Sequence, residues 1–325
     1  MTEIDKGSVS MLQMKIIKKF KTSYQIKFSN DYRFLCHTMG SKTIIYDTNS
    51  WEKIKELSKP NHPGFIHFSD NDEYLYIKNT SGTLYLYETV GFELIMTIKS
   101  NEKYQLVEAD FALTNTSLVI LDTLNTKDGN QLALINMENG DIRVLTQFKD
   151  SINYAYYNQF IEAERAYLFT LVYEITDKFN DEYIVRKIVK VKEPIKNEAI
   201  EVIENSEIWD WNFILFNSIH NSFIVVERYD IIMLDAQFKE IIKKVKLSDK
   251  VSPELGVFQY IHLSNDGRFI ILTYSKRVII LRYEDLEPIV VEEIQYACFG
   301  EFSSDDRFIL IGTWDNGYIL ENTLR

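Results

Sequence analysis

Apolar residues recur along this chain in stretches of about four to eight residues, and short polar segments separate the stretches. Residues 66–98 show the pattern well: Ile66 and Phe68 fall on one face of a strand, and the later stretches are rich in aromatic and β-branched residues. The polar segments between them have the composition of turns. The pattern therefore predicts four short antiparallel strands in this unit and an all-β fold for the chain.

A polar turn phrase between two apolar stretches is repeated along the chain. Clear copies occupy residues 28–35, 68–75, 263–270 and 302–309, and weaker copies begin at residues 111, 160 and 216. The seven copies follow one another at spacings of 39 to 56 residues. This period is typical of repeat proteins, and four short strands per repeat are typical of β-propellers. We therefore predict that residues 1–325 form one domain, a seven-bladed β-propeller of four-stranded antiparallel blades.

The two ends of the chain complement each other. The last unit has segments for three strands and stops at Arg325, whereas residues 11–20 form a spare strand ahead of the first unit. Pairing this strand with the last unit would close the ring and remove two exposed sheet edges. We therefore predict that residues 11–20 supply the outer strand of the last blade.

The repeated phrase, Phe-Ser-x-Asp-x-Arg followed by an aromatic and an aliphatic residue, resembles the turn between the first two strands of WD repeats. Echoes of that family's terminal Trp-Asp pair follow the third stretch of several units, as at Tyr46-Asp47 and Leu234-Asp235. Trp314-Asp315 spells the pair, but at a different place in its unit. The chain is thus similar to divergent prokaryotic WD-repeat proteins. The resemblance implies a platform for binding other proteins and transfers no functional residue.

Charge and composition narrow the class of partner. The chain has 36 Lys and Arg against 48 Asp and Glu, a net charge of −12, so it lacks the basic footprint of a nucleic-acid binder. We expect another protein as the partner, and the acidic balance of the chain favours a basic one. The sequence shows no secretory leader and no stretch of about 18 apolar residues, so no membrane association is expected. Cys36 and Cys298 are interpreted as reduced core thiols of a cytoplasmic protein.

One position per repeat faces away from the core residue of the predicted innermost strand. These positions are Lys27, His67, Asp110, Gln159, Leu215, His262 and Glu301. Six of the seven are polar, which a solvated central channel tolerates and a packed interface between blades does not. We favour a structural ring of satisfied charge pairs; the alternative is a site for a metal or a small ligand. Because the residues lack metal-ligand spacing, we expect no metal and no cofactor.

Units three to five contain the most unusual segments. Residues 122–130 and 174–182 predict long polar loops between second and third strands. Aromatic residues in loops are typical interface anchors. The candidates for partner binding are Tyr156, Tyr157, Phe179, Trp209 and Trp211. The alternative for the two tryptophans is that they begin an inner strand, with at least one of them in the core.

No motif of a known catalytic class is present in the sequence. The recurrent turn carboxylates, such as Asp70 and Asp305, are interpreted as caps for backbone N–H groups, because an active site is needed once and not in every repeat. We therefore predict a non-enzymatic protein-binding scaffold. Two alternatives stay open. One is a lactonase-like propeller hydrolase with its site at the central channel, and the other is an acidic inhibitor or immunity-type protein that neutralises a basic partner.

Overall fold

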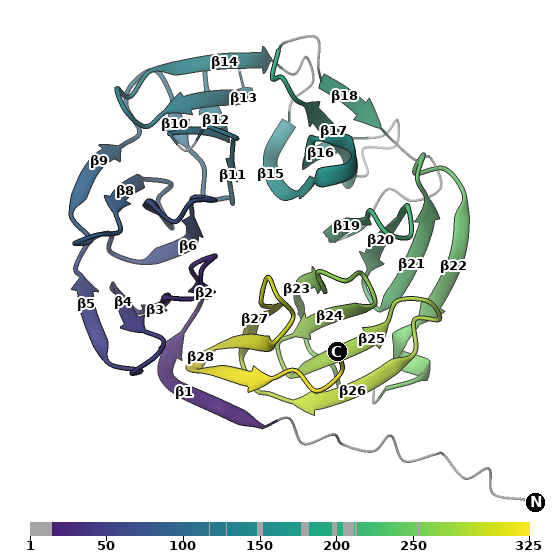
Figure 1. Ribbon diagram of the computed structural model, residues 1–325. Coiled ribbons are helices and arrows are strands. Elements are labelled where there is room, and N and C mark those ends of the chain that lie inside the picture. Colours follow the sequence, from purple (N-terminus) through teal and green to yellow (C-terminus); the bar gives the residue numbers. More distant parts are fainter. Residues whose placement is uncertain are drawn as a thin grey trace, which may run out of the picture.

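The computed structural model is a ring of seven antiparallel β-sheets around a central axis (Figure 1). It describes residues 15–116, 118–127, 129–147, 152–176, 182–196, 200–203, 211, 213–251 and 254–325. The sheets follow one another around the ring in chain order, with the first strand of each blade nearest the axis. The predicted seven-bladed β-propeller is therefore confirmed.

The blades are numbered 1 to 7 along the chain. The strands of blade 1 are β2 (Ile26–Phe28), β3 (Phe34–Met39), β4 (Lys42–Asp47) and β5 (Lys53–Leu57). Those of blade 2 are β6 (Pro63–Phe68), β7 (Tyr74–Asn79), β8 (Leu84–Glu88) and β9 (Leu94–Ile98). Those of blade 3 are β10 (Gln105–Leu106), β11 (Ala112–Leu113), β12 (Val119–Thr126), β13 (Gly129–Asn136) and β14 (Ile142–Gln147).

Blades 4 to 6 have four strands each. The strands of blade 4 are β15 (Ile152–Ile161), β16 (Ala166–Thr176), β17 (Glu182–Lys192) and β18 (Ile200–Ile203). Those of blade 5 are β19 (Phe213–Asn217), β20 (Ser222–Glu227), β21 (Asp230–Asp235) and β22 (Ile241–Lys246). Those of blade 6 are β23 (Phe258–Leu263), β24 (Phe269–Tyr274), β25 (Arg277–Arg282) and β26 (Pro288–Glu293).

Blade 7 contains β27 (Ala297–Phe302), β28 (Phe308–Glu321) and the N-terminal β1 (Ile16–Ser23). The described helices are the single-turn η1 (Glu162–Glu164) and η3 (Leu247–Asp249). Within the part of the chain that the structure describes, no helix is long and apolar enough to cross a membrane.

The N-terminal strand closes the ring. β28 supplies both middle strands of blade 7, because its first part pairs with β27 and its later part pairs with β1. The register places Phe20 opposite Gly317. Closure by the N-terminal strand is therefore confirmed, and only its bounds differ from the prediction of residues 11–20. The strand extends beyond residue 20 to Ser23, because its pairing with β28 continues as far as Thr313. Residues 1–14 lie outside the described part.

The repeated phrase builds the turn between the first and second strands of a blade. In blade 1 the Ser29 N–H donates to the Phe34 carbonyl at 3.0 Å, and the Phe34 N–H donates to Ser29 Oγ at 2.9 Å. Asp31 accepts from Ser29 Oγ at 2.8 Å. Equivalent bonds recur around Ser264 in blade 6 and Ser303 in blade 7. Each turn thus satisfies its own backbone groups, which is why the phrase recurs with the blades.

The fourth residue of this turn connects a blade to the preceding one. In blade 2, Asp72 accepts from the backbone N–H groups of Asn30 and Asp31 in blade 1, at 2.9 and 2.8 Å. Asp306 of blade 7 accepts from two backbone N–H groups of blade 6 in the same way, both at 2.9 Å. Tyr32 of blade 1 replaces the carboxylate at the closing interface, where its Oη accepts from a blade 7 N–H at 2.8 Å. These side chains therefore hold the ring in register.

Two lysines stabilise interfaces where the described residues form no such turn bond. Lys78 of blade 2 lies with its Nζ 2.8 Å from both carboxylate oxygens of Asp122 in blade 3, and both side chains are 0% exposed. Lys190 of blade 4 lies 2.8 Å from Glu164 and 5.3 Å from the centroids of two phenylalanine rings in blade 5. Buried cations thus contribute to the interfaces between blades 2 and 3 and between blades 4 and 5.

Apolar side chains fill the remaining space between neighbouring blades. One cluster combines Cys36 and Ile45 of blade 1 with Ile66 and Leu75 of blade 2. All four are buried, and burial of such surface is the main stabilising term of the fold. Both cysteines are free thiols, although Cys298 is half-buried and not a core residue.

The described residues of the segments predicted as long loops in blades 3 and 4 are paired strand. β12 continues to Thr126 and β13 begins at Gly129, so residues 122–126 and 129–130 belong to an extended hairpin. β16 continues to Thr176, which lies opposite Glu182 of β17. For blade 3 the loop prediction is wrong, because polar side chains do not prevent a backbone from pairing. In blade 4, residues 177–181 of the predicted loop lie outside the described residues.

The blade 3 turn also begins later than predicted. The bond from the Thr114 N–H to the Val119 carbonyl corresponds to the bond from Ser69 to Tyr74 in blade 2. Thr114, and not Ala112, therefore occupies the serine position of the repeat. The inner strand of this blade is divided into the two-residue β10 and β11, which both pair with β12. The shift explains why the copy at residue 111 looks degenerate.

Candidate functional site

Polar side chains of the innermost strands connect neighbouring blades around the axis. Lys27 Nζ of blade 1 lies 2.9 Å from Glu301 Oε2 of blade 7. His67 Nε2 of blade 2 lies 2.7 Å from Oδ1 of Asp110, which comes shortly before β11 of blade 3. The structure thus brings four of the residues singled out in the sequence into two direct pairs.

The other three ring positions are Gln159, Leu215 and His262. Gln159 of blade 4 forms two hydrogen bonds of 2.8 Å with the backbone N–H and carbonyl of Phe216 in blade 5. His262 Nδ1 of blade 6 accepts from the backbone N–H of Phe302 in blade 7 at 3.2 Å. Leu215 is 9% exposed and packs in the core between blades 5 and 6. The polar members of the ring therefore link successive blades.

Charge pairing and burial determine the protonation states near the axis. Burial opposes the charge of Lys27 and of Glu301, but their mutual attraction outweighs it, so the pKa of Lys27 is raised and the pKa of Glu301 is lowered. Burial lowers the pKa of His262 to about 4, so this imidazole is neutral at pH 7. Burial, followed by the Glu301 and Asp110 carboxylates, raises the pKa of Tyr260 well above its usual value. Near the axis, Lys27 and Glu301 thus form an ion pair, and the buried His262 and Tyr260 are neutral at pH 7.

This pairing limits what the axial residues can do chemically. Glu301 is 9% exposed and is bonded to Lys27, and the other axial carboxylate, Asp110, is bonded to His67. A general base must instead direct its lone pair at a substrate. Across the described ranges, no group of three or more His, Cys, Asp or Glu side chains is arranged to hold a metal ion.

Of the residues predicted to bind a partner, the structure describes Tyr156, Tyr157 and Trp211, and these three do not form one exposed surface. Tyr156 and Tyr157 lie within β15, the inner strand of blade 4, and both are half-buried. Trp211 is 0% exposed and packs in the core between blades 4 and 5. The prediction that Trp211 anchors a partner is therefore wrong, and it occupies the core as the alternative interpretation allows. Phe179 and Trp209 lie outside the described residues.

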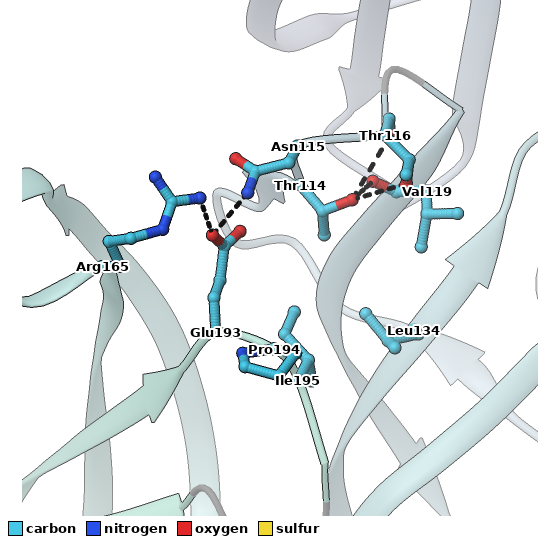
Figure 2. A pocket seen from close by; sticks show the side chains of 9 residues that line it. All are labelled: Thr114, Asn115, Thr116, Val119, Leu134, Arg165, Glu193, Pro194 and Ile195. Atoms are coloured by element: carbon cyan, nitrogen blue, oxygen red, sulfur yellow. Dashed lines mark hydrogen bonds and ion pairs between the residues drawn. The ribbon is translucent and has the colours of Figure 1, made fainter.

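A groove lies between blades 3 and 4 (Figure 2). Its volume is about 560 Å³, and its lining consists of Thr114, Asn115, Thr116, Val119, Leu134, Arg165, Glu193, Pro194 and Ile195. These residues come from the blade 3 turn, the blade 4 turn, β12, β13 and the segment after β17. A groove of this volume is in the range that binds small ligands or peptide side chains.

A single carboxylate organises the polar end of the groove. Figure 2 shows the Arg165 and Asn115 side chains converging on Glu193, and both donate to it. Tyr167 Oη donates to the same carboxylate at 2.6 Å, and the Glu193 side chain is 8% exposed. Because Arg165 compensates the charge of Glu193, this end carries no net charge. The rest of the lining consists of the apolar Val119, Leu134, Pro194 and Ile195, together with Thr114 and Thr116.

Sequence reasoning missed both this groove and an exposed aromatic pair on blade 7. The groove combines segments that are far apart in the chain, so no local pattern marks it. Trp314 and Tyr296 are 60% and 59% exposed. The position of Trp314 between the second and third apolar stretches of its unit is the signal that could have predicted its exposure.

Comparison of the chain with protein-family models found no match, and comparison with curated proteins found none either. The fold assigns the protein to the seven-bladed β-propellers.

Proposed function

We propose that this protein is a non-enzymatic protein-interaction module of the cytoplasm, and that the groove between blades 3 and 4 receives an extended segment of a partner protein. The observation that carries the proposal is the groove itself: an apolar lining with a charge-neutral polar end, built on the strands and turns of two blades. Sites on such a frame bind with little reorganisation.

The lining favours a particular kind of segment. Val119, Leu134 and Ile195 offer apolar surface, so the occupant should place an apolar side chain between the blades. Asn115 and Thr116 are exposed at the mouth, where their polar groups can bond an extended backbone. Since the charge of Glu193 is already compensated, a charged side chain gains little inside the groove. An extended and largely apolar segment is the best fit.

The resemblance of the repeats to WD repeats supports the same function, because members of that family are platforms for other proteins. The acidic balance of the chain is compatible with a scaffold and with an inhibitor of a basic partner, and both roles require a binding surface of this kind. We prefer the groove to the axis as the functional site. The axial polar groups already bond one another across blades, whereas the apolar lining of the groove offers surface that a ligand can cover.

The proposal is tested by selecting binders from a library of random linear peptides displayed on phage, with the wild-type protein as bait. The selected peptides are then titrated against Ile195→Glu, which places a carboxylate in the apolar lining and should weaken binding about tenfold or more. The matched control is Val90→Glu. Val90 is 98% exposed and, like Ile195, follows the third strand of its blade, so it lies on the same face of the ring.

Val90→Glu should melt like the wild type, Ile195→Glu should melt lower but stay folded because Ile195 packs against the edge of the core between blades 3 and 4, and only Ile195→Glu should lose the peptides. Equal loss in the two variants would indicate non-specific electrostatic repulsion. Undiminished binding to Ile195→Glu would place the docking surface elsewhere.

A further inference from the structure

Two exposed aromatic side chains, Tyr296 and Trp314, lie at the end of blade 7 beside the half-buried Tyr24. Tyr296 lies in the connection between β26 and β27. The backbone N–H of Trp314 donates to the backbone carbonyl of Tyr296 at 3.1 Å. The Trp314 ring lies 5.0 Å from the ring of Tyr24, at an interplanar angle of 74°. We call Tyr24, Tyr296 and Trp314, together with the adjacent Asp315, the aromatic rim. Large aromatic side chains that remain exposed on a well-packed domain mark interaction sites.

The rim is held by backbone hydrogen bonds as well as by the contact between the Trp314 and Tyr24 rings. Thr313 is 1% exposed, and its Oγ1 accepts from the N–H groups of Asp315 and Asn316 at 3.1 and 2.8 Å. Tyr296 has a φ of 59°, in the left-handed region that a bulky residue rarely adopts. His62 adopts the same conformation in the corresponding connection of blade 2, with a φ of 54°. The fold thus requires this backbone conformation, but it does not require a tyrosine there.

A second tryptophan of the chain shows what such a ring can bind. The Nζ of Lys18 lies 5.5 Å from the centroid of the Trp51 ring, a cation–π contact within the protein. Over Trp314, by contrast, no cation is placed by any of the described residues. Asp315 is exposed and forms no ion pair with the described residues, so an uncompensated carboxylate stands beside an open ring.

We propose that the aromatic rim binds a basic side chain, Lys or Arg, of a partner protein. The cation would lie against the Trp314 ring with Asp315 as its counter-charge. The net charge of −12 would attract such a partner at longer range. Lys21 lies opposite Asn316 in the β1–β28 register. Its positive charge should therefore repel a cationic side chain bound at the rim.

This inference goes beyond the proposed function and does not require the groove. Trp314 follows the second strand of its blade, whereas the groove residues follow first and third strands, so the two surfaces lie on opposite faces of the ring.

The test uses a short acetylated and amidated peptide of alternating Gly and Arg, with the Gly and Gln counterpart as the neutral control. The readout is the indole N–H signal of Trp314 in the nitrogen-15 NMR spectrum, assigned by its absence in Trp314→Phe. The titrations are carried out at about 0.15 M salt, which screens the general attraction of the cationic peptide to the acidic surface of the protein. The Arg peptide should shift this signal, and the Gln peptide should not.

Variants separate the rim from other surfaces. Trp314→Ala lacks the indole signal, so its affinity is measured from the backbone amide signals, and it should bind the Arg peptide about two- to fivefold more weakly, the size of an exposed cation–π contact. Asp315→Asn should also weaken binding of the Arg peptide, and Lys21→Gln should strengthen this binding. Tyr296→Gly should weaken binding and keep the fold, because glycine adopts a positive φ without strain. Trp51→Phe and Ile195→Glu are the controls that should bind as the wild type does.

Three results would overturn the inference: no shift of the Trp314 signal with the Arg peptide, an equal shift with the Gln peptide, or unchanged affinity in Trp314→Ala. Failure of the peptides selected for the groove would leave these measurements unaffected, so the two proposals fail separately.

Discussion

Replacing Lys78 by Met should destabilise the protein strongly, because it leaves Asp122 buried without a counter-charge. Both side chains are 0% exposed, and Lys78 Nζ lies 2.8 Å from both carboxylate oxygens. Lys78 Nζ also donates to the Ala109 carbonyl at 2.9 Å, which loses this bond. Breaking a buried pair on one side costs about 3–5 kcal/mol.

The double replacement separates the pair from its surroundings. Lys78→Met with Asp122→Leu removes both charges and fills the space with apolar groups, which is often neutral or stabilising. The two single variants should therefore each lose about 3–5 kcal/mol, while the double variant loses much less than their sum. Burial already raises the pKa of Asp122 beside its lysine. Without Lys78 this carboxyl should take up a proton more readily, so the cost of Lys78→Met should shrink as the pH falls.

Urea unfolding followed by far-ultraviolet circular dichroism at several pH values measures these free energies. The control is Lys244→Met. Lys244 is 45% exposed, and the variant breaks its ion pairs to Asp230 at 2.8 Å and to Glu227 at 3.2 Å. Such an exposed pair is worth at most about 1 kcal/mol. The reasoning fails if Lys78→Met costs no more than this control, or if the double variant loses the sum of the single losses.

Three further predictions concern the ring. Removing residues 1–23 deletes β1 and exposes the edge of β28, so we expect aggregation or loss of the cooperative melt; a truncated protein that melts like the full-length one would contradict closure. Asp72→Ala leaves the N–H groups of Asn30 and Asp31 without their acceptor, and calorimetry should show a loss of about 1–3 kcal/mol, which Val90→Ala should not show. His37 is 2% exposed, and burial lowers its pKa to about 4 from 6.5. The unfolded chain takes up this proton first, so stability is lost as the pH falls from about 6.5 to 4, by roughly 3 kcal/mol, and His37→Phe should flatten that slope in urea titrations.

The architecture was predictable because its determinants are local and repeated. The serine and aspartate of each turn bond their own backbone, so the phrase at Ser29 recurs at Ser264 and Ser303 wherever a blade makes the same turn. Closure was predictable from strand counting alone. The exact bounds of β1 were not, because they depend on how far its pairing follows β28.

The site residues were harder to predict because their environment depends on which blades are neighbours. Lys78 and Asp122 are both charged, and each taken alone suggests a solvated position, but the ring makes them a buried pair. Trp211 sits in a segment of polar residues and still reaches the core. The groove depends on Glu193, whose partners Asn115 and Arg165 belong to different blades.

Quantitative affinity capture from the native host tests the proposed function most directly. Extracts are passed over the wild-type protein, Ile195→Glu and Val90→Glu in parallel, and bound proteins are quantified by mass spectrometry. The account predicts a protein that is enriched equally by the wild type and Val90→Glu, and at least about tenfold less by Ile195→Glu. The same set of bound proteins on all three baits would contradict the assignment of partner binding to the groove between blades 3 and 4.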